Sequence, residues 1–134
     1  MTAHEAACEG GFFAFGRPVR TLDSITEAVG TAAGCVVVSG SHGGLSAGRF
    51  ALEAQTFLAV FNDAGVGKEG AGIAALALLA KAGRAGCTVA HSSARIGDAA
   101  STWEDGVISH VNPQAYELGA RPGLGLRSWL LNQA

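Results

Sequence analysis

The chain has 134 residues, which is the length of one ordinary domain and enough to bury a continuous core without disulfides or metal. Its net charge is −2 and it has no block of Lys or Arg, so it lacks the electrostatic footprint of a nucleic-acid-binding protein. Only 15% of its residues are charged, against roughly 25% in a typical soluble domain. We therefore expect a homo-oligomer, and the alternative is a compact monomer with a surface rich in Ala and Gly.

The cysteines and the first residues favour the cytoplasm. Cys8, Cys35 and Cys87 are odd in number and widely spaced, without a CxxC pair, as in proteins with reduced thiols. Residues 1–11 lack the apolar core of a signal peptide and are expected to form a loose N-terminal segment. The longest uncharged stretch of the central helix, Gly70 to Ala80, is too short to span a bilayer, so we expect no membrane partner.

The first third of the chain contains two short predicted elements. Residues 12–15 are apolar and predict a short edge strand before Arg17-Pro18. Residues 21–29 predict a short helix capped by Asp23 or Ser24. Asp23 is therefore interpreted as a cap and not as a catalytic acid.

Strands and helices then alternate. Apolar runs predict strands at residues 35–39, 57–61 and 87–90, and helices are expected between them at residues 45–54 and 68–82. This order indicates an α/β fold, a single three-layer domain over residues 1–134 with a partly parallel central sheet built from βα units. The second helix has almost no polar face, so we expect it to be buried between sheet and neighbouring helix or against another subunit.

The last third is more polar. The pairs Ser101 with Glu104 and Thr102 with Asp105 have the spacing of a capping box, which predicts a short helical turn. Residues 107–111 predict either a fourth strand or the start of a helix. The dipeptide Asn112-Pro113 is typical of a helix start, and residues 126–133 predict a terminal helix.

Polar side chains follow each of the three apolar strands. If the strands are parallel, these side chains meet at one edge of the sheet, where ligands bind in open α/β folds. The candidate catalytic residues are His42, Asp63, Lys68 and His91. Asp63 can orient an imidazole or act as a general base, and the histidines can exchange protons. The alternatives are that Asp63 only holds the glycine turn after it, that Lys68 is solvated, and that each histidine is an ordinary loop residue.

Glycine turns and an Arg–Asp pair are the candidates for ligand binding. Backbone N–H groups at Gly43-Gly44 and from Gly65 to Lys68 can cradle a carboxylate or phosphate. Arg95 can fork a substrate carboxylate while Asp98 positions it, or the two can form an internal pair that holds the loop. The candidate substrate-binding residues are Ser41, Gly43, Gly44, Asn62, Gly65, Gly67, Ser93, Arg95 and Asp98. Glu104, Asp105 and His110 are further candidates without an assigned role.

Several cofactor and catalytic motifs are missing from the sequence. In GVGK, the first glycine of a Walker A loop would fall at Asn62 and its Ser/Thr at Glu69, and GSHGGLSAG does not match GxGxxG. No cofactor is therefore expected. Metal is not expected either, since HxH and HExxH spacings are missing; the alternative is a metal held by His42 and His91 with Asp63, Asp98 or His110. No GxSxG elbow surrounds Ser41 or Ser93.

Three stretches, FNDAGVGKEGAGIAALALL, SSARIGDAASTWEDGVISHVN and ELGARPGLGLRSWL, resemble a family of small uncharacterised bacterial proteins over Val36 to Leu131. The tail from Ser109 to Leu131 is also faintly similar to the YunC-like domain, a small α/β family. Neither resemblance implies an activity or a residue role.

The residues at the sheet edge favour an enzyme for a small metabolite. We expect hydrolysis or acid/base isomerisation of a carboxylated or amide-bearing, anionic compound. One alternative is a non-catalytic regulatory module that binds an anion or metabolite within an oligomer. Another is a purely structural assembly subunit.

Overall fold

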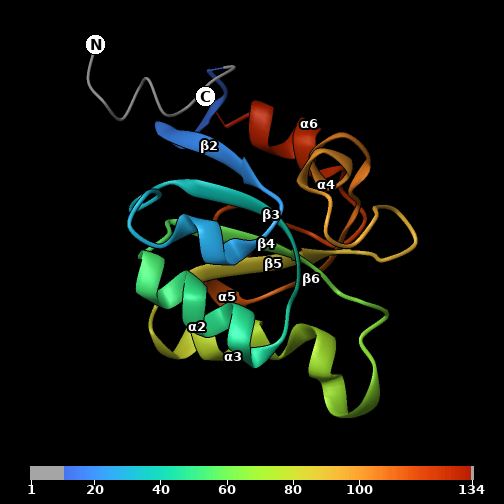
Figure 1. Cartoon of the computed structure of the whole chain (residues 1–134). Coiled ribbons are helices and arrows are strands. Elements are labelled where there is room, and N and C mark those ends of the chain that lie inside the picture. The colour runs from blue at the N-terminus through green and yellow to red at the C-terminus, as the bar shows by residue number, and fades with distance from the viewer. Residues whose placement is uncertain (1–10, 134) are drawn as a thin grey trace.

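A six-stranded sheet forms the middle layer of the protein, whose computed structural model describes residues 11–133 (Figure 1). The strands are β1 (Phe13–Ala14), β2 (Arg17–Leu22), β3 (Val36–His42), β4 (Leu58–Asn62), β5 (Ala85–Val89) and β6 (Ile108–Val111). They lie in sequence order, with β2 to β5 parallel and the outer strands β1 and β6 antiparallel to their neighbours. Apart from Gly11, the expected loose segment 1–11, including Cys8, lies outside the described residues.

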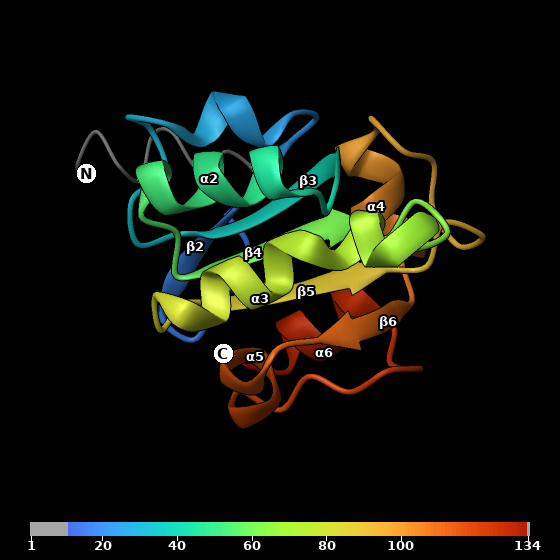
Figure 2. The same cartoon turned by 90° about the horizontal axis from the view of Figure 1, so that it is seen from below.

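Helices cover both faces of this sheet (Figure 2). The helical elements are η1 (Ile25–Ala28), α2 (Leu45–Ala54), η2 (Lys68–Ile73), α3 (Ala74–Lys81), α4 (Ala99–Asp105), α5 (Pro113–Glu117) and α6 (Leu126–Leu131). Alternate strand residues such as Val37 and Phe61 pack against η1, α2 and α3, while Val38 and Val60 pack with Trp103 of α4 on the other face. The predicted three-layer α/β domain with a partly parallel sheet is confirmed.

The N-terminal third differs from the prediction. The edge strand is only β1, and the strand β2 was missed because Arg17, Pro18 and Arg20 interrupt the apolar run expected of a buried parallel strand. The expected helix 21–29 is the short 3-10 turn η1, capped by Ser24 in a capping box with Glu27. Asp23 is a cap of another kind, because its Oδ1 accepts the Ala99 N–H at the start of α4, 2.9 Å away.

The alternating middle of the chain agrees closely with the sequence. Helix α2 has the predicted bounds, β3 extends to His42, and β5 covers residues 85–89. The expected helix 68–82 is broken, because Glu69 and Gly70 have φ of 58° and 71° inside η2, and the regular helix α3 begins only at Ala74. The close fit of this segment requires glycine at 72, where a Cβ would collide with the Asp63 carbonyl oxygen.

Helix α3 is not buried all round. Leu76 and Leu79 pack toward the sheet, and Ala75 meets Gly48 of α2, whereas Ala77 is exposed. One side of α3 therefore packs against the sheet and α2, and its other side faces outward. No helix within residues 11–133 is long and apolar enough to cross a membrane.

The C-terminal third settles the remaining predictions. The short helix α4 begins after Asp98, whose side chain accepts the Ser101 N–H, and not at Ser101 or Thr102 as expected. Residues 108–111 form a strand, and Asn112 caps α5 with Pro113 at its first position, as predicted. Helix α6 ends two residues earlier than expected.

Candidate functional site

The carboxyl ends of the central strands meet at one edge, as predicted. His42 of β3 is the register partner of Asn62, and Asn62 is the register partner of Val89 at the end of β5. After β4 the chain turns to the face covered by α3, whereas after β5 it turns to the opposite face, covered by α4 (Figure 2). Such a divergence of neighbouring connections opens a crevice in α/β sheets.

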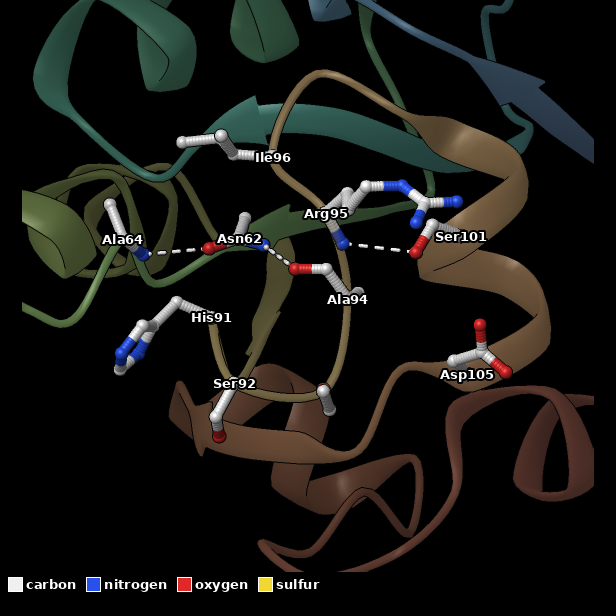
Figure 3. Close-up of a pocket in the computed structure, with 10 residues that line it drawn as sticks. Asn62, Ala64, His91, Ser92, Ala94, Arg95, Ile96, Ser101 and Asp105 are labelled. Carbon is white, nitrogen blue, oxygen red and sulfur yellow. Dashed lines mark hydrogen bonds between the residues drawn. The ribbon is translucent and has the colours of Figure 1, made fainter.

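A cavity of about 510 Å³ lies at this divergence (Figure 3). It is lined by Asn62, Ala64, His91, Ser92, Ser93, Ala94, Arg95, Ile96, Ser101 and Asp105. The cavity volume is within the range of small-molecule sites.

Asn62 joins the two loops that frame the cavity. Its Nδ2 donates to the Ala94 carbonyl 3.1 Å away, and its Oδ1 accepts the Ala64 N–H at 2.8 Å (Figure 3). The side chain is buried, and both of its polar groups are used within the protein. Asn62 therefore positions the cavity walls.

Asp63 follows Asn62 and has two histidines near its carboxylate. Its side chain is only 6% exposed, and Oδ1 accepts the N–H groups of Gly65 at 2.8 Å and His91 at 3.0 Å. The Nδ1 atom of His91 lies 3.4 Å from Oδ1, and Nδ1 of His110 lies 3.9 Å from Oδ2. These distances are longer than hydrogen bonds but short enough for a strong electrostatic interaction.

The surroundings keep Asp63 ionised. Burial alone raises the pKa of Asp63, but hydrogen bonds from the Gly65 N–H, the Ser109 hydroxyl and the His91 N–H, together with the His91 imidazole, outweigh burial and lower it. An anionic oxygen beside Nδ1 favours the tautomer that carries its proton there, which leaves Nε2 of His91 with a free lone pair. The His91 side chain is 62% exposed at the cavity, so its second nitrogen is accessible to a ligand.

His110 joins this cluster from β6. It is the register partner of Thr88, and its Nδ1 lies 3.4 Å from the Thr88 hydroxyl and 3.2 Å from that of Ser109. From the sequence, His110 was a candidate without an assigned role and an alternative metal ligand. Pairing the predicted strand 107–111 antiparallel to 87–90 would have placed it near Asp63.

Arg95 and Asp98 form the internal pair that was one of the two sequence interpretations. The Arg95 Nε lies 3.5 Å from Asp98 Oδ2, and the Arg95 N–H donates to the Ser101 hydroxyl. The hydrogen bond from the Ser101 N–H is the main cause that holds the pKa of Asp98 below its usual range; desolvation opposes it, and the Arg95 guanidinium and the Ala100 N–H lower the pKa further. Among residues 11–133, nothing bonds to the two terminal nitrogens of Arg95, whose side chain is 83% exposed at the cavity.

The glycine turns use their N–H groups internally. Gly65 donates to the Asp63 carboxylate, Gly67 donates to the Gly65 carbonyl at 2.8 Å, and Gly43 donates to the Asn62 carbonyl at 2.9 Å. Gly44 is the N-cap of α2. The glycines at 43, 65 and 67 therefore build the edge and do not offer a free cradle for an anion.

The hydroxyl groups of two candidate serines are also engaged within the fold. Ser93 Oγ donates to the Ala90 carbonyl at 2.7 Å and accepts the Val107 N–H at 3.0 Å. Ser41 Oγ accepts the Ile25 N–H at 2.9 Å. Both hydroxyls hold loops together.

Three of the four predicted catalytic residues, His42, Asp63 and Lys68, do not line the cavity. Lys68 is exposed on η2, and His42 lines a second cavity of about 450 Å³ beside η1 and α2, with its ring over Gly44. Asp63 does contact His91, and Arg95 lines the same cavity as His91. Within residues 11–133, no group of three His, Cys, Asp or Glu side chains is arranged to hold a metal ion.

Comparisons of the chain with protein-family models, with curated proteins and with solved structures found no match.

Proposed function

We propose that the protein is an enzyme acting on a small metabolite, in which His91 is the general acid and base and Asp63 positions it. The observation that supports this most is the buried carboxylate of Asp63, held by two N–H groups and lying 3.4 Å from Nδ1 of a histidine at a cavity. A carboxylate placed in this way fixes the tautomer of an imidazole and stabilises its protonated form.

The proposed chemistry is hydrolysis or acid/base isomerisation of a carboxylated or amide-bearing compound. Nε2 of His91 takes a proton from a water or from the substrate and returns it later in the reaction. Arg95 supports the same proposal, because nothing in residues 11–133 bonds to its terminal nitrogens, which can therefore bind a substrate carboxylate at the cavity. Asp63 also holds the turn through Gly65, so the sequence's two interpretations of Asp63 are compatible.

One observation favours a non-catalytic binding module as the second candidate. Of the four predicted catalytic residues, His42, Asp63 and Lys68 do not line the cavity, so the single imidazole of His91 must supply the proton transfer there. A ligand that is bound and released unchanged needs only the Arg95 side of the cavity.

A metabolite screen separates these candidates. Compounds that raise the melting temperature are incubated with the protein in D₂O, and mass spectrometry then detects a hydrolysis product or deuterium incorporation. His91→Ala is expected to lower the rate at least about 100-fold, as for loss of a general acid–base group, while substrate affinity changes little. The matched control is Glu53→Gln, an exposed residue of α2. Binding without turnover, or turnover that survives His91→Ala, would contradict the proposal.

A further inference from the structure

Asp105 places a negative charge at the cavity. It is the last residue of α4, its side chain is exposed, and it lines the same cavity as His91 (Figure 3). Within residues 11–133, no hydrogen bond or ion pair engages the Asp105 side chain, in contrast to Asp98, which caps α4, and to Glu104, whose carboxylate lies 3.3 Å from Arg127. Asp105 is therefore a carboxylate available to a ligand.

Arg95 supplies the opposite charge, and its neighbours hold it in place. Asp98 contacts the guanidinium through Nε only, and Ser101 accepts the Arg95 backbone N–H at 2.9 Å. The fork of terminal nitrogens remains free within the described residues. No ion pair joins Arg95 to Asp105, although both line the cavity.

Within residues 11–133, the cavity has one cation and one anion whose charged ends have no partner, and this arrangement fits a ligand that carries both charges. A simple anion satisfies Arg95 but meets the negative Asp105, and a simple amine satisfies Asp105 but leaves the guanidinium without a partner. An α-amino acid carries its carboxylate and its ammonium on one carbon, so one small molecule can use both. The neutral wall formed by Ala64, Ala94 and Ile96, with Ile96 54% exposed, favours an apolar side chain.

We propose that the cavity binds a zwitterionic α-amino acid with an apolar side chain, with its carboxylate on Arg95 and its ammonium on Asp105. This inference rests on the proposed function, because it names the substrate class of the same cavity. It also replaces the simple anionic metabolite expected from the sequence, since that expectation gave Asp105 no role.

The test compares each amino acid with its singly charged relatives. Isothermal titration calorimetry measures the binding of the L and D forms of alanine, valine, leucine, methionine and phenylalanine. For each amino acid, the two relatives are the acid that lacks the amino group and the amine that lacks the carboxylate. We expect at least one amino acid to bind about tenfold or more tightly than both of its relatives, as for a charge-assisted hydrogen bond. Asp105→Asn removes the preference over the acid, Arg95→Gln removes the preference over the amine, and Glu53→Gln on α2 changes neither.

The outcomes separate this inference from the proposed function. Failure of every amino acid to bind more tightly than its relatives overturns the inference, and so does a preference over the acid that survives Asp105→Asn. If a metabolite of another charge type is converted in a reaction that requires His91, the proposed function holds while the inference fails. If an amino acid binds with the expected charge preferences but is never converted, the inference holds while the enzymatic function fails.

Discussion

Replacing Asp63 tests the centre of the site before any substrate is known. In Asp63→Ala, the N–H groups of Gly65 and His91 lose an acceptor that lies 2.8 and 3.0 Å away. A part-buried donor without a partner costs roughly 1–3 kcal/mol, so we expect the free energy of unfolding to fall by about 3 kcal/mol. Asp63→Asn keeps an oxygen for both bonds but replaces the charge and the second oxygen by a neutral NH₂ group, which is expected to cost about 1 kcal/mol.

The pH dependence of these losses identifies the charge as their cause. The pKa of Asp63 is lower in the folded protein than its usual value, so its ionised form stabilises the fold above about pH 3.9, where an unfolded Asp titrates. This stabilisation disappears as the pH falls through the lower pKa of the folded state. The free-energy gap between wild type and Asp63→Asn should therefore close in acid. The gap to Asp63→Ala should persist, because a protonated carboxyl group still accepts hydrogen bonds.

Urea unfolding between about pH 3 and pH 7 provides the measurement, with fluorescence of the buried Trp103 and Trp129 as the signal. Asp105→Asn is the matched control, since this carboxylate is exposed and has no partner in the described chain; it should change stability by less than about 0.5 kcal/mol. The reasoning is refuted if Asp63→Ala is no more destabilising than the control, or if the gap to Asp63→Asn is the same at every pH.

Two further predictions concern backbone strain and a buried thiol. Val66 has φ of 67°, which is costly for a β-branched residue. Val66→Gly should therefore raise the melting temperature by the equivalent of about 1 kcal/mol. A thermal scan that showed no gain would mean that the backbone at Val66 carries no strain. Burial raises the pKa of Cys87 to about 12, so iodoacetamide at neutral pH should modify it only in unfolded protein. Peptide mass mapping that found Cys87 modified as fast in native as in denatured protein would contradict its burial.

The central fold could be predicted because its signals are local. Short apolar runs marked β3, β4 and β5, and α2 was predicted residue for residue. Strand β2 was missed because its polar residues are tolerated only near the edge of the sheet, where Arg17 and Thr21 remain exposed. The break in the helix at Glu69 depends on the tight approach of Gly72 to the Asp63 carbonyl, a tertiary contact that the sequence does not reveal.

The candidate site was predictable only in part. Asp63 and His91 follow neighbouring parallel strands, so the sheet edge that brings them together could be deduced from the strand order. The sequence alone did not distinguish the two interpretations of Arg95 and Asp98. In the structure the two interpretations are compatible, because the ion pair forms through Nε and, within residues 11–133, leaves the two terminal nitrogens of Arg95 without a partner. Asp105 has no local signal, because an exposed carboxylate at the end of a helix is ordinary.

The difference between His42 and His91 follows from the direction of the connections. The segments after β3 and β4 both turn to the face of α2 and α3, and Gly43 is bonded between them, donating to Asn62 and accepting from Ala75. His42 is thereby directed to the cavity beside η1 and α2. After β5 the chain crosses to the other face, so the loop that carries His91 separates from the loop that carries Ala64 and leaves the larger cavity between them. Equal positions at the ends of parallel strands therefore have unequal access to a ligand, because access depends on the face to which the next helix belongs.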